Sequence, residues 1–484
     1  MTLLEHLLTS VTDALARAGG TPYLVGGAVR DAMLGLESKD LDILVTNLEP
    51  ETLKSVLETV GKVDLVGKSF GVFKVSKDGE TLDVALPRLE KSTGTHHRDF
   101  EVSYDAYLPL EMDLERRDLT VNAMAWRLSL ETSDFRRSML EKSSEFLIDP
   151  FGGKIDLENR TLRAVGNARA RFEDDPLRML RLARFIAKLD FEVEARTALA
   201  VLENAHLIET VALERMQIEL MGLLAAKHPE GVLRALRFLR DSGLLERVLP
   251  DFKATYGYDQ QNPHHHLTLD EHSFEAVRYA VQHGFDPLSR LALLLHDLGK
   301  PQTRSFGPDG VAHYYEHEVV GSEIAARILE RLKFPLEVQR SVTKLVRQHM
   351  RPPLEASTRV LRRFVNDLGT DWERALEVRV SDRMAHTSEP DFDAQSWLEN
   401  TRARCQQVSV ELETFDERQL AISGLELTAH FGVTGSQIGD LKKRAARAVV
   451  EGEVVNEREA VLSWLERIWT NRSSGALEPS HEVV

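Results

Sequence analysis

The sequence predicts an α+β protein in which a mixed α/β domain precedes an all-α remainder. Short β-rich runs such as LDILVT, GVFKVSK and TLDVALP alternate with helical stretches up to about residue 150. From about residue 156 to 475, nearly every segment has apolar residues at three- and four-residue spacing, as in PLRMLRLARFIAKL. At 484 residues the chain exceeds the size at which a single core stops growing, so we expect several domains.

Composition and charge exclude several classes of protein. No apolar run approaches membrane-spanning length, and the first residues mix charges into an amphipathic pattern unlike a signal peptide, so we expect a cytoplasmic protein with no membrane partner. The single cysteine, Cys405, excludes an internal disulfide framework and a cysteine metal cluster. The formal net charge of -16 argues against coating nucleic acid through bulk charge, so any RNA contact must be local.

One local cluster of positive charge stands out in the helical part that follows the α/β domain. Its members are Arg160, Arg163, Arg169, Arg171, Arg178, Arg181 and Arg184. Judged from this cluster alone, a solvated helix face with nearby carboxylates and a contact to RNA or a triphosphate are about equally supported.

A short apolar strand followed by a double-glycine turn begins the first candidate site. The run YLVGGAVRD places Gly26 and Gly27 at the turn and Arg30 at the start of a helix. Glycines let backbone N–H groups approach a phosphate, the helix N-terminus adds positive potential, and arginine gives bidentate phosphate contacts. The turn suits a triphosphate, although a plain strand-to-helix turn has the same pattern.

A pair of carboxylates follows in the run SKDLDILV. Asp40 and Asp42 are two residues apart on a predicted strand and therefore face the same side. Such a pair repels unless cations bridge it, and phosphoryl transfer with two Mg²⁺ ions needs a pair of this kind. Asp83, on a further apolar strand, is our candidate for the third carboxylate. A lone Asp-x-Asp more often lies at a solvated strand edge, and the upstream turn is what favours a metal site.

The order and spacing of four motifs resemble the class II tRNA nucleotidyltransferases, the CCA-adding enzymes, and their bacterial poly(A) polymerase relatives. The motifs are LVGGAVRD, KDLDILV, LDVALPR and ERRDLTVNAMAW. Further along, IDPFGGKIDLENRTLRAV is similar to the turn that closes the head in that family, and FEDDPLRMLRLARF is similar to its base-reading helix. The resemblance implies a head that adds C, C and A to the 3′ end of tRNA from CTP and ATP, without a nucleic-acid template.

The same resemblance implies a role for each matched residue. It makes Asp40 and Asp42 the Mg²⁺ ligands and, together with Asp83, the catalytic carboxylates. The nucleotide-binding residues that it implies are Gly26, Gly27, Arg30, Arg117, Asp118, Asn122, Asp175, Arg178 and Arg181. Asp175 and Arg178 would read the Watson–Crick edge of the base, because a carboxylate accepts from an amino group and a guanidinium donates. Their spacing of three predicts that both lie on one helix face.

Two features bear on which nucleotides are added. Asp174 stands where the family has glutamate, which shortens a carboxylate near Arg178 by one methylene group. The stretch after Asp83, which contains His96 and His97, matches a loop that enzymes limited to CC addition shorten or alter, and here it looks full length. We therefore favour complete CCA addition or addition of the terminal A, with CC addition and poly(A) synthesis as alternatives.

A second set of chemically reactive residues is spread over successive predicted helices. These residues are His272, His296, Asp297, His317, His349 and Asp382. His296 and Asp297 are adjacent in an apolar helix, where both side chains would be costly unless they bind a metal or each other. Imidazole together with carboxylate suits Mg²⁺, Mn²⁺, Ni²⁺ or Co²⁺ better than a structural Zn²⁺ site.

The order of these residues resembles the HD phosphohydrolase superfamily, in which neighbouring metals activate water against phosphate esters. In that resemblance His317 and His349 match the additional ligands of two-metal members, and Lys300 could assist phosphate binding. Some bacterial CCA-adding enzymes carry such a domain and hydrolyse 2′,3′-cyclic phosphate or 2′-nucleotide ends. Nearby histidines that are alternative ligands are His264, His265, His266 and His313.

The expected organisation therefore has four parts. They are a nucleotidyltransferase head at 1–152, a neck with nucleotide-recognition and RNA-binding helices at 153–250, an HD phosphohydrolase body at 251–400, and a helical tRNA-binding tail with a disordered end at 401–484. The alternative from a different class is an HD phosphohydrolase whose head only binds RNA, and the intact head carboxylates argue against it. The sequence leaves the oligomeric state open.

Overall fold

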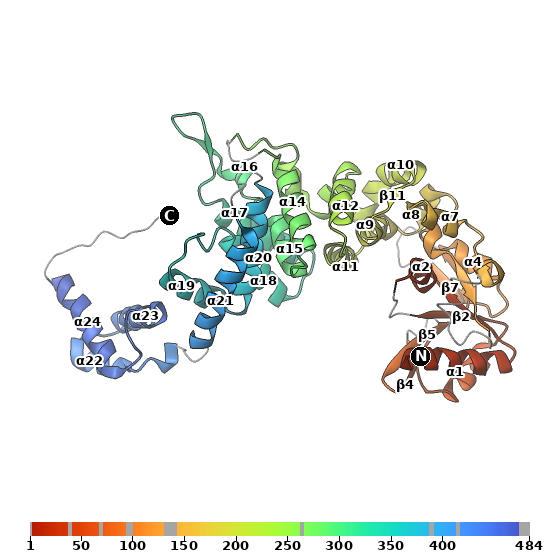
Figure 1. The fold of residues 1–484 in the computed structure, drawn as a ribbon, viewed down its shortest axis with the longest axis horizontal. Helices are drawn as coiled ribbons and strands as arrows, with labels where there is room; N and C mark the ends of the chain where they lie inside the picture. Colours follow the sequence, from red (N-terminus) through yellow and green to blue (C-terminus); the bar gives the residue numbers. More distant parts are fainter. Residues whose placement is uncertain are drawn as a thin grey trace. The chain divides into compact units, whose positions relative to one another are not determined.

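The computed structural model of the chain describes residues 2–36, 41–66, 71–92, 100–129, 143–261, 266–386, 392–412 and 417–473. It divides into two compact units, Met1–Lys253 with Arg331–Lys333, and Ala254–Glu330 with Phe334–Val484. Figure 1 shows strands gathered in the red-to-orange N-terminal part and helices through the green-to-blue remainder. The α+β class with an N-terminal mixed head is thereby confirmed.

A seven-stranded sheet organises the N-terminal part of the first unit, in the order β3-β4-β5-β2-β1-β8-β9. Its strands are β1 (Thr21–Val25), β2 (Asp42–Thr46), β3 (Lys62–Val66), β4 (Val72–Lys77), β5 (Glu80–Ala85), β8 (Ala125–Arg127) and β9 (Leu147–Ile148). The β2–β5 pair is parallel, and the other neighbouring pairs are antiparallel. A separate hairpin is formed by β6 (Arg88–Ser92) and β7 (Phe100–Tyr104).

The helices of the first unit fall into a group around the sheet and a group after it. The first group is α1 (Leu3–Arg17), α2 (Gly27–Met33), α3 (Pro50–Glu58), α4 (Leu110–Glu115), α6 (Ser143–Phe146) and α7 (Gly153–Glu158). The second is α8 (Ala168–Asp174), α9 (Leu177–Leu189), α10 (Ala195–Asn204), α11 (Leu213–Leu224), α12 (Pro229–Asp241) and α13 (Leu245–Val248). Helix α9 packs against both α11 and α12, because its apolar residues recur at helical spacing.

The segment expected to read the base is two helices and not one. Helix α8 ends at Asp174 and α9 begins at Leu177, with Asp175 extended between them at φ -140 and ψ 98. Pro176 explains the break, because a proline ring excludes helical backbone at the preceding residue. The prediction that Asp175 shares a helix face with Arg178 was therefore wrong. Asp175 instead accepts a 3.2 Å hydrogen bond from the Leu177 N–H at the start of α9.

In the residues that the structure describes, the second unit is helical apart from one short hairpin. Its helices are α14 (Leu269–Gln282), α15 (Pro287–Leu295), α16 (Lys300–Thr303), α17 (His317–Arg331), α18 (Leu336–Gln348), α19 (Thr358–Leu368), α20 (Trp372–Ala385), α21 (Ala394–Leu412), α22 (Gly424–Phe431), α23 (Ser436–Glu451) and α24 (Arg458–Ser473). Helices α14, α15 and α20 pack against one another, and α18 packs on α15. The hairpin joins β12 (Ser305–Phe306) to β13 (Ala312–His313).

The last three helices have a core of their own and an ionic connection to α19. Buried leucines and valines of α22, α23 and α24 form that core. Glu451, at the end of α23, accepts hydrogen bonds from Arg359 and Arg363 of α19. Although burial opposes its charge, these arginines and Arg447 lower the pKa of Glu451 to about 2. Among the described residues, no helix is both long and apolar enough to cross a membrane.

The only cysteine of the chain should be unreactive in the folded protein. Cys405 lies fully buried on α21, and burial raises the pKa of its thiol to about 12. Because the thiolate is the nucleophile, native protein at pH 8 should not react with iodoacetamide, and urea-denatured protein should take up one equivalent. Intact-mass measurement distinguishes the two. Rapid alkylation of the native protein would contradict the packing of α21.

Candidate functional site

The head carboxylates lie on the parallel strand pair. The pairing of β2 with β5 sets Asp42 directly beside Asp83, and residues paired in this way point to the same face of a sheet. Asp42 is exposed and Asp83 is half-buried, with Lys74 of β4 3.8 Å from the Asp83 carboxylate. Asp40 lies outside the described residues. The two described carboxylates are therefore adjacent and accessible, as a divalent cation requires.

The double-glycine turn follows the neighbouring strand β1, with Gly26 as the N-cap of α2 and Gly27 as the first residue of that helix. Gly26 has φ 70, a left-handed conformation that favours glycine. A Cβ atom at Gly26 would lie 2.6 Å from Nη1 of Arg117, so glycine is what allows this arginine against the turn. Burial lowers the pKa of Arg117, whereas the charges of Asp113 and Asp42 raise it. Arg117 therefore lies against the glycine turn and also within reach of the charge of Asp42.

A continuous polar network connects the helix after the turn to α9. The Arg30 side chain is only 3% exposed and donates to Asp31 at 2.8 Å and to the side-chain oxygen of Asn122. The Asn122 amide donates in turn to Asp118 at 2.9 Å. Arg181 of α9 donates to the other oxygen of Asp118 at 2.8 Å. In this structure Arg30 supports the turn from within the protein, with its guanidinium already hydrogen-bonded.

The two predicted base-reading side chains are each held by other groups. The Asp175 carboxylate is 3.1 Å from Nη2 of Arg215, which projects from α11. Arg178 donates to the backbone carbonyls of Arg116 at 2.8 Å and Arg171 at 3.2 Å. Both lie at the junction of α8, α9 and α11, and their predicted role in base selection stays a prediction.

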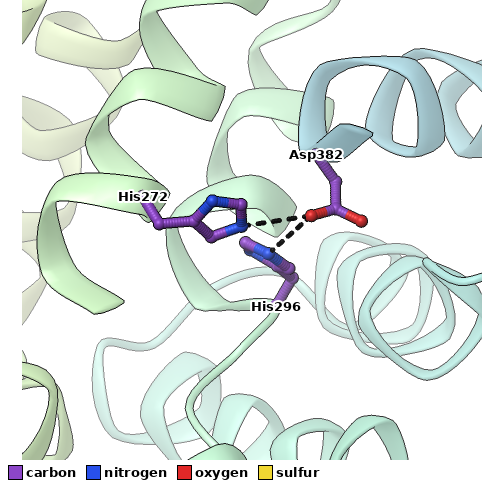
Figure 2. Close-up of side chains that lie close together, drawn as sticks. All are labelled: His272, His296 and Asp382. Atoms are coloured by element: carbon purple, nitrogen blue, oxygen red, sulfur yellow. Dashed lines mark hydrogen bonds and ion pairs between the residues drawn. The ribbon is translucent and has the colours of Figure 1, made fainter. Parts of the chain in front are cut away.

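The second candidate site is a buried cluster in the helical unit. His272 comes from α14, His296 directly follows α15, and Asp382 lies on α20. Figure 2 shows both imidazoles directed at the same Asp382 oxygen, with Nε2 to Oδ1 distances of 3.1 Å for His272 and 3.5 Å for His296. These three residues place ligand atoms close enough together to hold one metal ion.

A further set of ligand atoms adjoins the first and shares His296 with it. The Asp297 carboxylate is 3.1 Å from Nε2 of His296, 3.5 Å from Nε2 of His317 and 3.8 Å from Nε2 of His349. The Nε2 atoms of His317 and His349 are 3.2 Å apart. His296, Asp297 and His349 make a second group with metal-binding spacing. The predicted residues of this site therefore all converge, and the cluster has room for two neighbouring ligand sets.

Backbone carbonyl groups orient three of these imidazoles in the same way. In each case Nδ1 hydrogen-bonds to the carbonyl three residues earlier, at 2.6 Å for His296, 2.7 Å for His317 and 2.7 Å for His349. Because a neutral imidazole has one N–H, donation from Nδ1 leaves Nε2 as an unprotonated ligand atom. When these imidazoles are neutral, as metal binding requires, all three Nε2 atoms therefore face the cluster as electron-pair donors.

Burial and charge at this cluster fit a cation. Nε2 of His296 and both oxygens of Asp297 are fully buried, and Lys300, 2.7 Å from one of these oxygens, supplies one positive charge to a set of polar atoms that is costly to bury without charge compensation. Although burial opposes its charge, His296 and Lys300 lower the pKa of Asp297, so this carboxylate stays ionised. Burial and the charge of His296 lower the pKa of His349 to about 3, so its imidazole is neutral at physiological pH.

Comparison with known proteins bears on both sites. Three family models match: "Poly A polymerase head domain" over residues 22–163, "Probable RNA and SrmB- binding site of polymerase A" over 190–255, and "HD domain" over 269–386. The "Multifunctional CCA protein" of Azoarcus sp. (strain BH72) is 36% identical over 68% of this chain and 73% of its own length. The chain belongs to the multifunctional CCA protein family. The protein of the same name from Methylococcus capsulatus is also 36% identical, over 68% of this chain and 71% of its own.

Solved structures agree with this family assignment. The Bacillus stearothermophilus CCA-adding enzyme in complex with CTP is 26% identical, with a TM-score of 0.70 over 98% of this chain and 100% of the other. A CCA-adding enzyme with ATP is 20% identical, with a TM-score of 0.56 over 98% and 95% of the two chains, and it shows the shared fold. The predicted family resemblance is confirmed, and the protein is an enzyme with a nucleotidyltransferase head and an HD domain. The four domain boundaries stay a prediction.

Several supporting residues were not predicted. Asp113 is fully buried and holds both Arg116 and Arg117, and its spacing of three and four residues from them was an available signal. His386, four residues after Asp382, lies 3.7 Å from it and stacks on His272. Of the alternative ligands, His313 lies in β13, and residues 264 and 265 are outside the described residues.

Proposed function

We propose that this protein adds CCA to the 3′ end of tRNA from CTP and ATP at the head, and hydrolyses phosphate esters at RNA 3′ ends at the HD centre. The observation that carries the first activity is the register of Asp42 with Asp83 beside the Gly26–Arg117 turn. The related enzyme whose structure contains CTP supports the choice of nucleotide. We propose that the protein acts in the cytoplasm, where it would meet its tRNA substrate.

The head residues would share the work of nucleotide transfer. Asp40 and Asp42 would hold Mg²⁺, with Asp83 as the third carboxylate. When bound, this metal lowers the pKa of the attacking 3′-hydroxyl and neutralises charge on the leaving pyrophosphate. The N–H groups of the glycine turn and Arg117 would bind the triphosphate, because backbone donors and a guanidinium fit its charge.

The remaining head and neck residues would select and position the nucleotide. Asp118, Asn122 and Arg181 form a hydrogen-bonded group that connects the head to α9 and would hold the ribose. Asp175 and Arg178 would present an acceptor and donors to the base edge. Since both are already held by fixed partners, selection would use groups with a defined geometry and not freely rotating side chains.

The HD residues would bind one or two divalent ions, with Mg²⁺, Mn²⁺, Ni²⁺ and Co²⁺ as the candidates. The observation that carries this activity is the convergence of buried imidazole and carboxylate ligand atoms from separate helices. A bound ion of this kind makes a water molecule nucleophilic at neutral pH. Lys300, with Nζ 2.7 Å from Asp297, would place a positive charge where the phosphate binds.

Three tRNA substrates test the head assignment and separate the alternatives. Purified protein is given tRNAs that end before CCA, after CC and after CCA, with CTP and ATP supplied separately and together. Complete CCA synthesis predicts two C additions to the first tRNA, one A addition to the second and none to the third. Addition of C alone or A alone would show a CC-adding or A-adding enzyme, and a long A ladder would show a poly(A) polymerase. No extension of any tRNA would contradict the proposal.

A further inference from the structure

Exposed aromatic side chains gather on the hairpin that connects α16 to α17. The hairpin pairs Ser305 with His313 and Phe306 with Ala312, and it follows α16 in the helical unit (Figure 1). Phe306 is 56% exposed and Tyr315, directly after β13, is 72% exposed. Rings of this size are usually covered in a folded protein, so their exposure on one short segment indicates a binding surface.

These rings alternate with cationic and imidazole groups. The Arg304 guanidinium lies 5.0 Å from the ring centre of Tyr258 and 5.5 Å from that of Phe306. The His313 and Tyr315 rings are stacked, with centres 5.6 Å apart and planes within 13° of parallel. Rings interleaved with a guanidinium are typical of surfaces that stack nucleobases.

A short series of contacts connects this surface to the HD centre. The Tyr314 hydroxyl donates to the Gln260 carbonyl at 2.6 Å, and Lys300 donates to the Gln260 side chain at 2.9 Å. Lys300 also lies over the Tyr314 ring and 2.7 Å from the Asp297 carboxylate. The Tyr314 carbonyl, in turn, accepts from Nδ1 of His317. Tyr314 therefore contacts the metal-site residues directly, while its sequence neighbours His313 and Tyr315 belong to the exposed stack.

We propose that Arg304, Phe306, His313 and Tyr315 form a stacking platform for the unpaired bases of an RNA 3′ end whose phosphate is hydrolysed at the HD centre. The proposal rests on the proposed phosphohydrolase function and narrows its substrate to single-stranded RNA ends. Stacking suits this task because every base has a π-face, so the platform accepts any terminal nucleotide. The positive charge of Arg304 adds attraction for the RNA backbone.

Two substrates, one with bases and one without, test the platform. The metal-loaded, full-length protein is given a short single-stranded RNA with a terminal 2′-phosphate, and separately glycerol 2-phosphate, which has no base or ring. In Phe306→Ala, the ratio of kcat/KM for RNA to kcat/KM for glycerol 2-phosphate should fall roughly tenfold, mainly through KM for the RNA. Phe306→Trp should restore the ratio to within about threefold, because the larger ring also stacks.

Controls separate the platform from a general effect on the unit. Leu336→Ala removes an equally prominent exposed apolar side chain from the far end of α18, about 20 Å along the helix from His349, and should leave the ratio unchanged. An unchanged ratio in both Phe306→Ala and Tyr315→Ala would overturn the platform. An equal fall in kcat/KM for RNA and for glycerol 2-phosphate would also overturn the platform, since it would show only a structural effect on the metal site.

The wild-type protein distinguishes failure of the platform from failure of the proposed function. Hydrolysis of glycerol 2-phosphate with no preference for the RNA end would leave the phosphohydrolase in place and overturn the platform. A metal-loaded protein that hydrolyses neither substrate would overturn the phosphohydrolase, and the platform with it. Competitors identify what the surface binds. If an excess of unrelated protein lowers the ratio of kcat/KM for RNA to that for glycerol 2-phosphate, and unphosphorylated RNA does not, the surface binds protein and not RNA.

Discussion

Asp42→Asn is expected to lower the rate of nucleotide addition by at least about a thousandfold while leaving phosphate-ester hydrolysis intact. The substitution keeps the shape of the side chain and the β2–β5 pairing but removes one of the charges that would hold Mg²⁺. A loss of this size corresponds to about 4 kcal/mol of transition-state stabilisation, which is the scale of metal-ion catalysis. Incorporation of labelled CTP and ATP into tRNA measures the effect.

Asp64→Asn is the matched control for this variant. Asp64 is an exposed carboxylate on β3 of the same sheet that forms an ion pair with Lys62 and lies in register with Lys74 of β4, outside the carboxylate pair of β2 and β5. It should keep full addition activity and the same melting temperature as wild type. Addition by Asp42→Asn within tenfold of wild type would contradict the assignment of the head carboxylates.

Asp297→Asn is expected to abolish phosphohydrolase activity, again by about a thousandfold or more, with tRNA extension retained. Asp297 is the carboxylate that His296, His317 and His349 all approach, so its charge is central to holding a cation there. Metal content measured on the purified protein should fall together with hydrolysis of 2′,3′-cyclic phosphate.

The control for this second variant is Asp367→Asn. Asp367 is an exposed residue of α19 whose carboxylate pairs with Arg351, and it should keep both metal and hydrolysis. Because Asp297 is buried, a melting curve accompanies each assay. If Asp297→Asn were folded and lost tRNA extension to the same degree as hydrolysis, the two sites would not be separate.

The parts of the sites that follow from local patterns could be predicted from sequence. The Asp-x-Asp spacing on an apolar strand, together with the upstream glycine turn, selected Asp42, and a further apolar strand selected Asp83; the structure sets the two side by side. The spread of His and Asp over successive helices was sufficient to select the metal cluster, whose members converge. The helical pattern is informative because a carboxylate or imidazole inside an apolar helix is costly unless it has a partner. The strand pattern is informative because alternate residues of a strand share a face.

The parts that depend on tertiary packing could not be predicted. The contact of Asp175 with Arg215 exists because α11 packs beside α9, and a spacing of forty residues has no periodic signal. The break between α8 and α9 did have a local signal in Pro176, which the one-helix interpretation overlooked. The hydrogen bonds from the histidines to backbone carbonyl groups form only where a helix begins or ends at the right residue. Helix ends are the part of a secondary structure that sequence predicts least well.

We propose that one chain carries two independent sites that act in sequence on the same RNA end. A tRNA that ends before CCA in a 2′,3′-cyclic phosphate, with CTP, ATP and both metals supplied, tests it most directly. Wild-type protein should open the cyclic phosphate with one water to a 2′-phosphate, hydrolyse that ester with a second water to release inorganic phosphate, and then extend the tRNA. Asp42→Asn should stop at the free 3′-hydroxyl, and Asp297→Asn should leave the end blocked. A mixture of the two variants should restore full extension. The contradicting result is a mixture that fails to extend this blocked tRNA although Asp297→Asn alone extends a tRNA with a free 3′-hydroxyl, because two independent sites would then have complemented each other.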